Sequence, residues 1–150
     1  MILFALAFAF VIAGCDGNAV FEKKIDGFEN NRWEKARPLQ FSVDVEKAGN
    51  YSFDIFFSHV YGYQFPEIPM ILEIQYPGGR TEKEELVIAI KDADGNDSGD
   101  CAGDYCDLWH TVQPPSTLEP GHYEVRLIND FQGPFLPNIL GIGLKVSLQE

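Results

Sequence analysis

Oxygen-bearing side chains concentrate in one stretch of the sequence, from Asp92 to Asp107. This segment, DADGNDSGDCAGDYCD, holds six aspartates in sixteen positions. Calcium binds about six to eight hard oxygen ligands, so the stretch is a candidate for a structural calcium site. The residues that would supply its ligands are Asp92, Asp94, Asn96, Asp97 and Asp100.

The spacing of these residues does not fit an EF-hand. With Asp92 in the first position, Asp97 stands where that motif requires glycine, and Gly103 stands where it requires glutamate. Aspartate, asparagine and glycine are also the most common turn-forming residues. The stretch therefore has two interpretations, a calcium loop outside the EF-hand class or a solvated turn, and turn chemistry alone accounts for its composition.

Two cysteines lie in the same stretch. Cys101 and Cys106 are close enough in sequence to close a small disulfide in an oxidising envelope compartment, and two free thiols are the alternative. A zinc site is less favoured, because there is no second cysteine pair and the three histidines are dispersed along the chain: His59, His110 and His122.

Aromatic residues gather in the segment SHVYGYQFPEIP, residues 58–69. If exposed, Tyr61 and Tyr63 could join Trp109 in a platform that stacks on sugar rings. Aromatic residues at every second position are equally typical of a buried strand face. No polar residues are visibly arranged to bind sugar hydroxyls, so packing in the core or in an interface is favoured and glycan binding is the alternative.

No catalytic motif is present in the sequence. It contains no G-x-S-x-G, no H-E-x-x-H and no P-loop. The adjacent acids Glu84 and Glu85 would point to opposite faces of a strand, which does not suit a glycosidase pair. We therefore predict no catalytic residues and no enzymatic activity.

The elements that must position these residues are strands. Segment 39–45, LQFSVDV, alternates apolar and polar residues with a period of two, as a half-buried strand does. Gly49 and Asn50 predict a tight hairpin from this segment to 51–57, and PGG at 77–79 predicts another turn. The predicted strands are 19–25, 39–45, 51–57, 70–76, 85–90, 106–112, 122–128 and 138–148.

Short connections between these segments leave no room for crossover helices, so the strands must pair antiparallel. About eight short strands with turns between them are typical of a sandwich. We predict a single all-β domain, an antiparallel β-sandwich of the jelly-roll kind, within the 150 residues.

The charge of the chain limits its partners. The formal net charge is −12, and the few lysines and arginines are scattered, so we expect no nucleic-acid partner. An acidic surface is also repelled by anionic lipid headgroups. Membrane association must therefore depend on the N-terminus.

The N-terminus predicts a lipid anchor. Residues 2–13 are an apolar run too short to span a bilayer and suited to the core of a signal peptide. The sequence Ile12, Ala13, Gly14 and Cys15 resembles the lipobox of bacterial lipoproteins, in which the cysteine is acylated and becomes the first residue. We therefore expect a signal peptide at 1–14 and a domain at 15–150 anchored through Cys15. The alternative is a buried first strand with a core cysteine.

Several strand-and-turn segments resemble the gliding-motility lipoprotein family GldH. The resemblance lies in IAGC, RPLQFSVDVEKAGNYSFDIFF, YGYQFP before MILEIQYPGG, DADG, LEPGHYEVRLI and NILGIGLKVSL. It implies a non-enzymatic cell-envelope lipoprotein that carries acyl chains such as palmitate and serves as an accessory or structural component of an envelope protein machine.

The expected partners are the membrane, through the lipid, and other envelope proteins. The expected location is the periplasmic or cell-surface face of a membrane, and no cofactor is expected apart from the candidate calcium. The alternative function is a surface carbohydrate-binding module with a structural calcium loop, in which Tyr61, Tyr63 and Trp109 stack on sugars.

Overall fold

The computed structural model describes residues 17–150, so the predicted signal peptide and Cys15 lie outside the described residues. Eight long strands form the body of the domain: β1 Ala19–Asp26, β3 Leu39–Val45, β4 Gly49–Val60, β5 Glu67–Gln75, β6 Thr81–Ala89, β8 Tyr105–Thr111, β10 Gly121–Asn129 and β12 Ile139–Leu148. The shorter elements are β2 Trp33–Glu34, β7 Asp100–Ala102, β9 Ser116–Leu118, β11 Phe135–Leu136 and the 3₁₀ helix η1 Glu29–Asn31.

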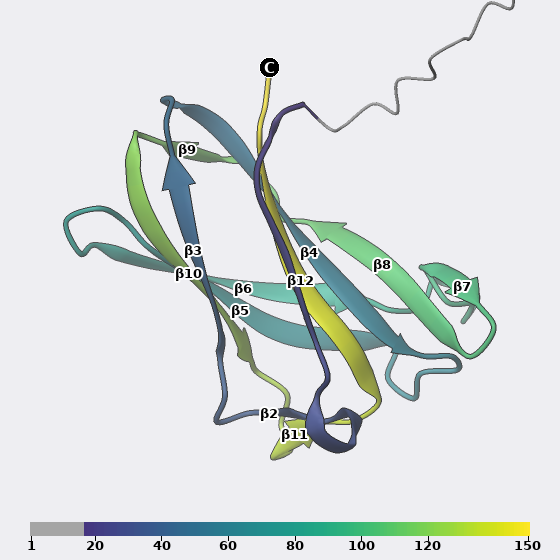
Figure 1. The fold of residues 1–150 in the computed structure, drawn as a ribbon. Helices are drawn as coiled ribbons and strands as arrows, with labels where there is room; N and C mark the ends of the chain where they lie inside the picture. The colour runs from purple at the N-terminus through teal and green to yellow at the C-terminus, as the bar shows by residue number, and fades with distance from the viewer. Residues whose placement is uncertain (1–16) are drawn as a thin grey trace, which may run out of the picture.

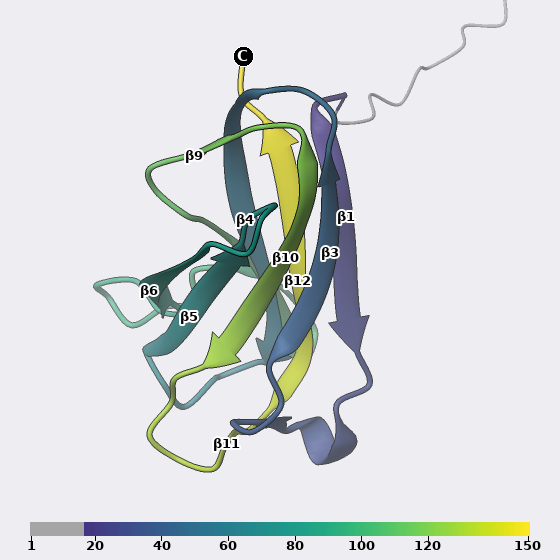
Figure 2. The ribbon, with the colours of Figure 1, turned by 90° about the vertical axis from the view of Figure 1, so that its left-hand side faces the viewer.

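The strands form a two-sheet sandwich (Figure 1). One sheet has six strands, with the order β1-β12-β4-β8-β7 and β9 paired to β4, and the other has the order β3-β10-β5-β6. Figure 2, turned by 90°, shows β3, β10, β5 and β6 in front of β4 and β12. Every pairing between these strands is antiparallel. Successive long strands lie in different sheets except for β5 and β6, which form a hairpin, and this order is that of a jelly roll, as predicted.

The core is built by the alternation that the sequence shows. In β4 every second residue from Tyr51 to His59 is buried and faces the opposite sheet. In β3, Phe41, Val43 and Val45 are buried and the residues between them are exposed. The period of two therefore identified the buried face of both strands.

The predicted hairpin between segments 39–45 and 51–57 is wrong. β3 pairs with β10 and β4 pairs with β12, so the chain passes from one sheet to the other at this turn. Glycine supplies the tight turn in either arrangement, and only the packing of the sheets decides between them. The hairpin predicted at PGG is confirmed, because β5 pairs with β6 and Gly78 and Gly79 have positive φ.

The four short strands were not predicted, because two or three residues are too few to show a period. They close the ends and edges of the sandwich. For example, β2 pairs with β11, and the Asn129 side chain donates a hydrogen bond to the carbonyl of Trp33 at 2.9 Å. These contacts seal the end of the core beneath the long strands.

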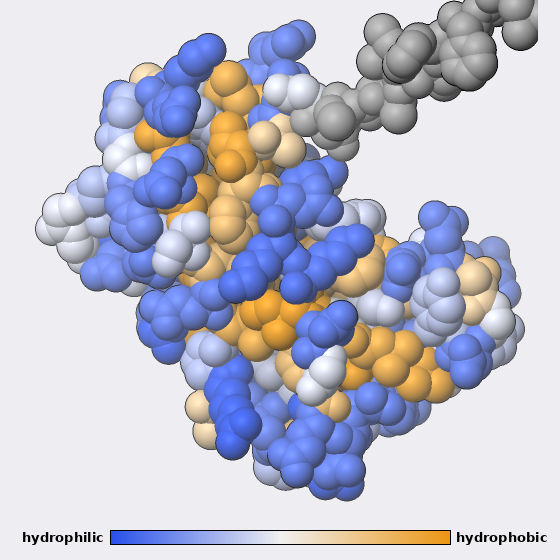
Figure 3. Space-filling view, in the orientation of Figure 1, coloured by the Kyte–Doolittle hydropathy of each residue, from blue (hydrophilic) through white to orange (hydrophobic). Residues whose placement is uncertain are grey.

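Apolar residues run along the middle of the view in Figure 3, with hydrophilic residues on both flanks. In this orientation β1 and β3, the adjacent edge strands of the two sheets, face the viewer. Phe21, Ile25 and Leu39 on these strands are partly buried and pack against the core. The sandwich is therefore closed along this edge by side chains, not by strand pairing.

Candidate functional site

The outer face of the six-stranded sheet carries an aromatic residue pair on neighbouring strands. Phe56 on β4 lies directly opposite Trp109 on β8, and both point away from the core. The same row continues through Gly143 on β12 to Lys24 on β1. Four strands thus place one residue each in a line across this face.

Contacts along this row are close. The ring centroids of Phe56 and Trp109 are 5.1 Å apart. The Lys24 ammonium lies 4.0 Å from the centre of the Phe56 ring and 5.2 Å from that of Trp109. The Lys145 ammonium lies 4.9 Å from the Trp109 ring. These are cation–π distances, so each lysine is attracted to the negative face of a ring.

Trp109 remains 42% exposed in spite of these contacts, and Tyr105 on the same strand is also exposed. Beside them is a shallow hollow of about 330 Å³, whose lining includes Lys24, Phe56 and Asp107. We call the surface formed by Lys24, Phe56, Tyr105, Trp109 and Lys145 the aromatic face. It offers an indole ring flanked by positive charges in a chain whose net charge is −12.

Glycine at position 143 keeps this face open. A Cβ there would lie 2.8 Å from the Lys23 carbonyl oxygen and 2.9 Å from Lys24 Cγ. Only a residue without a side chain leaves the space that the Lys24 stem uses to reach Phe56. The aromatic face therefore depends on a residue that makes no contact through a side chain of its own.

Of the residues of this face, only Trp109 was expected from the sequence. Phe56 could have been recognised from the sequence, because in YSFDIFF it is a large apolar residue at an outward position of the alternation. The sequence around Lys24 and Lys145 does not indicate that these lysines contact the rings. They reach the rings from β1 and β12, which only the sheet order brings next to β4 and β8.

The three aromatic residues of the predicted platform do not form one surface. Tyr61 is 60% exposed, but Tyr63 is only 2% exposed, and its hydroxyl donates a hydrogen bond to the Pro137 carbonyl at 2.9 Å. Burial raises the pKa of Tyr63 far above its ordinary value. A stacking platform that includes Tyr63 is therefore wrong, and this residue belongs to the core.

The predicted calcium residues are engaged within their own loop. Asp92 Oδ1 accepts hydrogen bonds from the backbone N–H groups of Asp94 and Asn96, each at 2.9 Å. Asp97 forms an ion pair with Lys91 at 3.4 Å, and Asp100 lies on β7. Within residues 17–150, these four aspartates do not form a group of three whose oxygens lie within 4.8 Å of one another. The calcium site remains a prediction.

Cys101 and Cys106, predicted as a pair, are joined in a disulfide. They lie directly opposite each other on β7 and β8, with their Cα atoms 4.0 Å apart. In the chain-entropy model, a disulfide that closes a loop this short raises the free energy of unfolding by about 2 kcal/mol. The bond therefore fixes one hairpin and does little to restrict the rest of the chain.

The chain belongs to the GldH lipoprotein family, whose model matches residues 20–146. This membership confirms the family resemblance and supports a non-enzymatic envelope lipoprotein. A comparison with curated proteins gave no match. Within residues 17–150, no helix is both long enough and apolar enough to cross a membrane.

Solved structures with a similar arrangement include a family 35 carbohydrate-binding module from Clostridium thermocellum. It is 18% identical, with a TM-score of 0.43, and the match covers 86% of this chain and 93% of the module. An exo-β-1,3-galactanase from Phanerochaete chrysosporium is 9% identical over 83% of this chain and 29% of the enzyme, with a TM-score of 0.38. At these scores neither likeness carries a functional argument.

Proposed function

We propose that this member of the GldH lipoprotein family is an accessory or structural component of an envelope protein machine of the gliding-motility type. Lipidated Cys15 holds it at a membrane, at the periplasmic or cell-surface face. The aromatic face binds another envelope protein. The proposal combines the family membership, the lipobox and the chemistry of the aromatic face.

The exposure of Trp109 is the observation that carries this proposal. Tryptophan and tyrosine are enriched in protein interfaces, and they provide much of the binding energy where they become fully buried. Trp109 and Tyr105 are two of the five large hydrophobic residues exposed among the described ones, and both lie on one strand. Lys24 and Lys145 add positive charge, which favours a partner segment that places carboxylates around an apolar side chain.

Site-specific crosslinking in native membranes tests this proposal. A photo-reactive amino acid replaces Trp109 in one variant and His122, on the outer face of the other sheet, in a matched control. We expect a crosslinked envelope protein from position 109 and none from position 122. Equal crosslinking from both positions, or none from position 109 in membranes that retain the anchored protein, would contradict the proposal.

The second candidate function is glycan binding, and one observation favours it. Asp107, beside Trp109 in the hollow, has a buried carboxylate oxygen, Oδ1, without a hydrogen-bond partner. Sugar recognition commonly combines an aromatic ring with such an acceptor for hydroxyl groups. A glycan array compares the intact protein with the Trp109→Ala variant. Binding that the variant loses would support this function, and no binding by the intact protein would exclude it for the glycans on the array.

A further inference from the structure

A buried histidine next to the disulfide has a nitrogen without a partner. His59 on β4 is fully buried, and its Nδ1 lies 2.9 Å from the Val60 carbonyl oxygen. Because a carbonyl can only accept, Nδ1 carries the proton and Nε2 presents a lone pair. Nε2 has no hydrogen-bond partner. An unpaired buried polar atom lowers the stability of the fold, so its presence calls for an explanation such as a role in binding.

Both cysteines of the disulfide lie in the same row of the sheet as this histidine. His59 is directly opposite Cys106 on β8, and Cys106 is directly opposite Cys101 on β7. The imidazole thus lies beside the Cys106 sulfur, to which the Cys101 sulfur is bonded. Nothing in the sequence indicated this, because Cys106 follows His59 by 47 positions.

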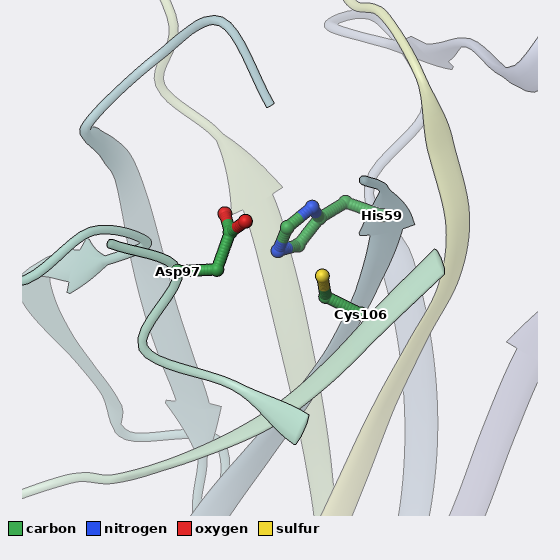
Figure 4. A group of neighbouring side chains, drawn as sticks. All are labelled: His59, Asp97 and Cys106. Carbon is green, nitrogen blue, oxygen red and sulfur yellow. The ribbon is translucent and has the colours of Figure 1, made fainter. Parts of the chain in front are cut away.

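A carboxylate approaches the same place from the loop that follows β6. Asp97 is held there by a backbone bridge to Lys91 and by the hydrogen bond from Ser98 N to the Ile90 carbonyl at 2.8 Å. The ligand atoms of His59, Asp97 and Cys106 all lie within 4.8 Å of one another. Figure 4 shows a ring nitrogen of His59 pointing toward the Asp97 carboxylate, with the Cys106 sulfur beside the ring.

We propose that reduction of the Cys101–Cys106 disulfide opens a binding site for a divalent transition-metal ion such as Zn²⁺. The donors are His59 Nε2, an Asp97 carboxylate oxygen and the Cys106 thiolate, whose ligand atoms already lie together. The Cys101 thiolate, which is outside this group while the disulfide holds it, is the fourth donor once reduction frees its side chain. Two thiolates, one imidazole and one carboxylate form a donor set that suits tetrahedral Zn²⁺. While the disulfide is intact its sulfur atoms are neutral and bonded to each other, so the site is closed.

The redox step balances with a dithiol as reductant. The dithiol transfers two electrons and two protons, the Cys101–Cys106 bond breaks, and the reductant becomes a cyclic disulfide. Binding of the ion then displaces the two protons from the thiols.

The surroundings of the donors favour this role. The Nδ1–H bond to the Val60 carbonyl fixes the ring orientation, as the outer hydrogen bond of a metal-binding histidine usually does. The rings of Tyr63 and Phe57 lie 5.0 and 5.7 Å from the His59 ring and keep water from one side. Lys91, paired with Asp97, holds the carboxylate from another side.

A zinc titration of the full chain, purified from membranes in detergent, tests the proposal. One sample keeps its disulfide, and the other is reduced with a dithiol that is then removed without oxygen. We expect one Zn²⁺ per chain in the reduced sample and none at this site in the oxidised one. Cobalt substitution should give the visible absorption of a tetrahedral thiolate site.

Variants assign the donors. His59→Gln and Asp97→Asn should each weaken zinc binding at least ~10-fold in the reduced protein, since changes in the outer shell alone have effects of this size. Asp97→Asn is nearly isosteric and keeps the proposal testable if His59→Gln does not fold. His122→Gln, at a surface histidine, is the matched control and should bind as the unaltered chain does.

A double variant, Cys101→Ser with Cys106→Ser, should bind no zinc at this site. Because it keeps Cys15, any zinc that it still binds measures the contribution of that cysteine. Absence of binding by the reduced protein would overturn the proposal. So would equal binding in the oxidised and reduced samples, or unchanged affinity in both His59→Gln and Asp97→Asn.

Discussion

The outer faces of the two sheets each carry a row of residues across four strands, but the residues in the two rows differ in kind. On the six-stranded sheet, a row across four strands runs through Lys24, Gly143, Phe56 and Trp109. On the four-stranded sheet, the equivalent row runs through Gln40, Arg126, Glu73 and Lys83. The first row ends in an exposed indole, whereas the second consists of polar and charged groups.

Several charges on the four-stranded sheet are paired within the protein. Arg126 lies 2.8 Å from Glu73 Oε1, and Lys83 lies 3.0 Å from Oε2. His122 bridges Asp44 and Glu124 at 2.7 and 2.8 Å. The charged residues of this row are therefore paired within the sheet, whereas the aromatic face presents an exposed indole ring.

The largest effect should come from filling the glycine position of the aromatic face. We expect Gly143→Ala to lower the free energy of unfolding by about 1–3 kcal/mol, because its Cβ would meet the Lys23 carbonyl oxygen and the Lys24 stem. Denaturant unfolding measures this change. Gly141→Ala on the same strand is the matched control, since its Cβ would be at least 3.5 Å from its neighbours and should cost little.

A smaller effect should follow from breaking the charged row of the other face. Glu73→Gln removes the anion between Arg126 and Lys83, and we expect a loss of about 1 kcal/mol near neutral pH, because both cations are partly exposed. Glu84→Gln, which removes an exposed charge from β6, is the control. Equal stabilities of the two variants would show that the row is not a stabilising network.

The same carboxylate should make stability depend on pH. Burial acts to raise the pKa of Glu73, but hydrogen bonds from Lys83 and Arg126 outweigh it and lower the pKa below 4.5. A group with a lowered pKa in the folded protein stabilises it above the unfolded value, and this contribution is lost as the pH falls through the folded pKa. Thermal unfolding below about pH 5 should therefore show a steeper loss in the unaltered protein than in Glu73→Gln.

The smallest effect concerns His122, which is exposed. Hydrogen bonds to Asp44 and Glu124 raise its pKa above 6.5. Its contribution to stability is therefore present in full below pH 6.5 and is lost as the pH rises through the folded pKa. Titration by NMR should place the His122 midpoint above that of the Asp44→Asn variant. Identical midpoints would show that the bridge does not persist in solution.

The sequence by itself determined which residues are buried and how the long strands are spaced. The period of two is a local property, since successive side chains on a strand point to opposite faces. The predicted segments overlap all eight long strands, and the period of two placed Phe41 and Phe53 in the core. The closely spaced Cys101 and Cys106 were predictable as a pair for the same reason, because their hairpin is local.

Only the tertiary structure decided which strands are neighbours. That order depends on how the two sheets pack over one core, so it cannot be predicted from any short segment of the sequence. The segments 39–45 and 51–57 predicted a hairpin, yet they lie in different sheets. The same packing brought Lys24 to Trp109 and His59 to Cys106, and so created both the aromatic face and the proposed metal site from residues that are distant in the chain.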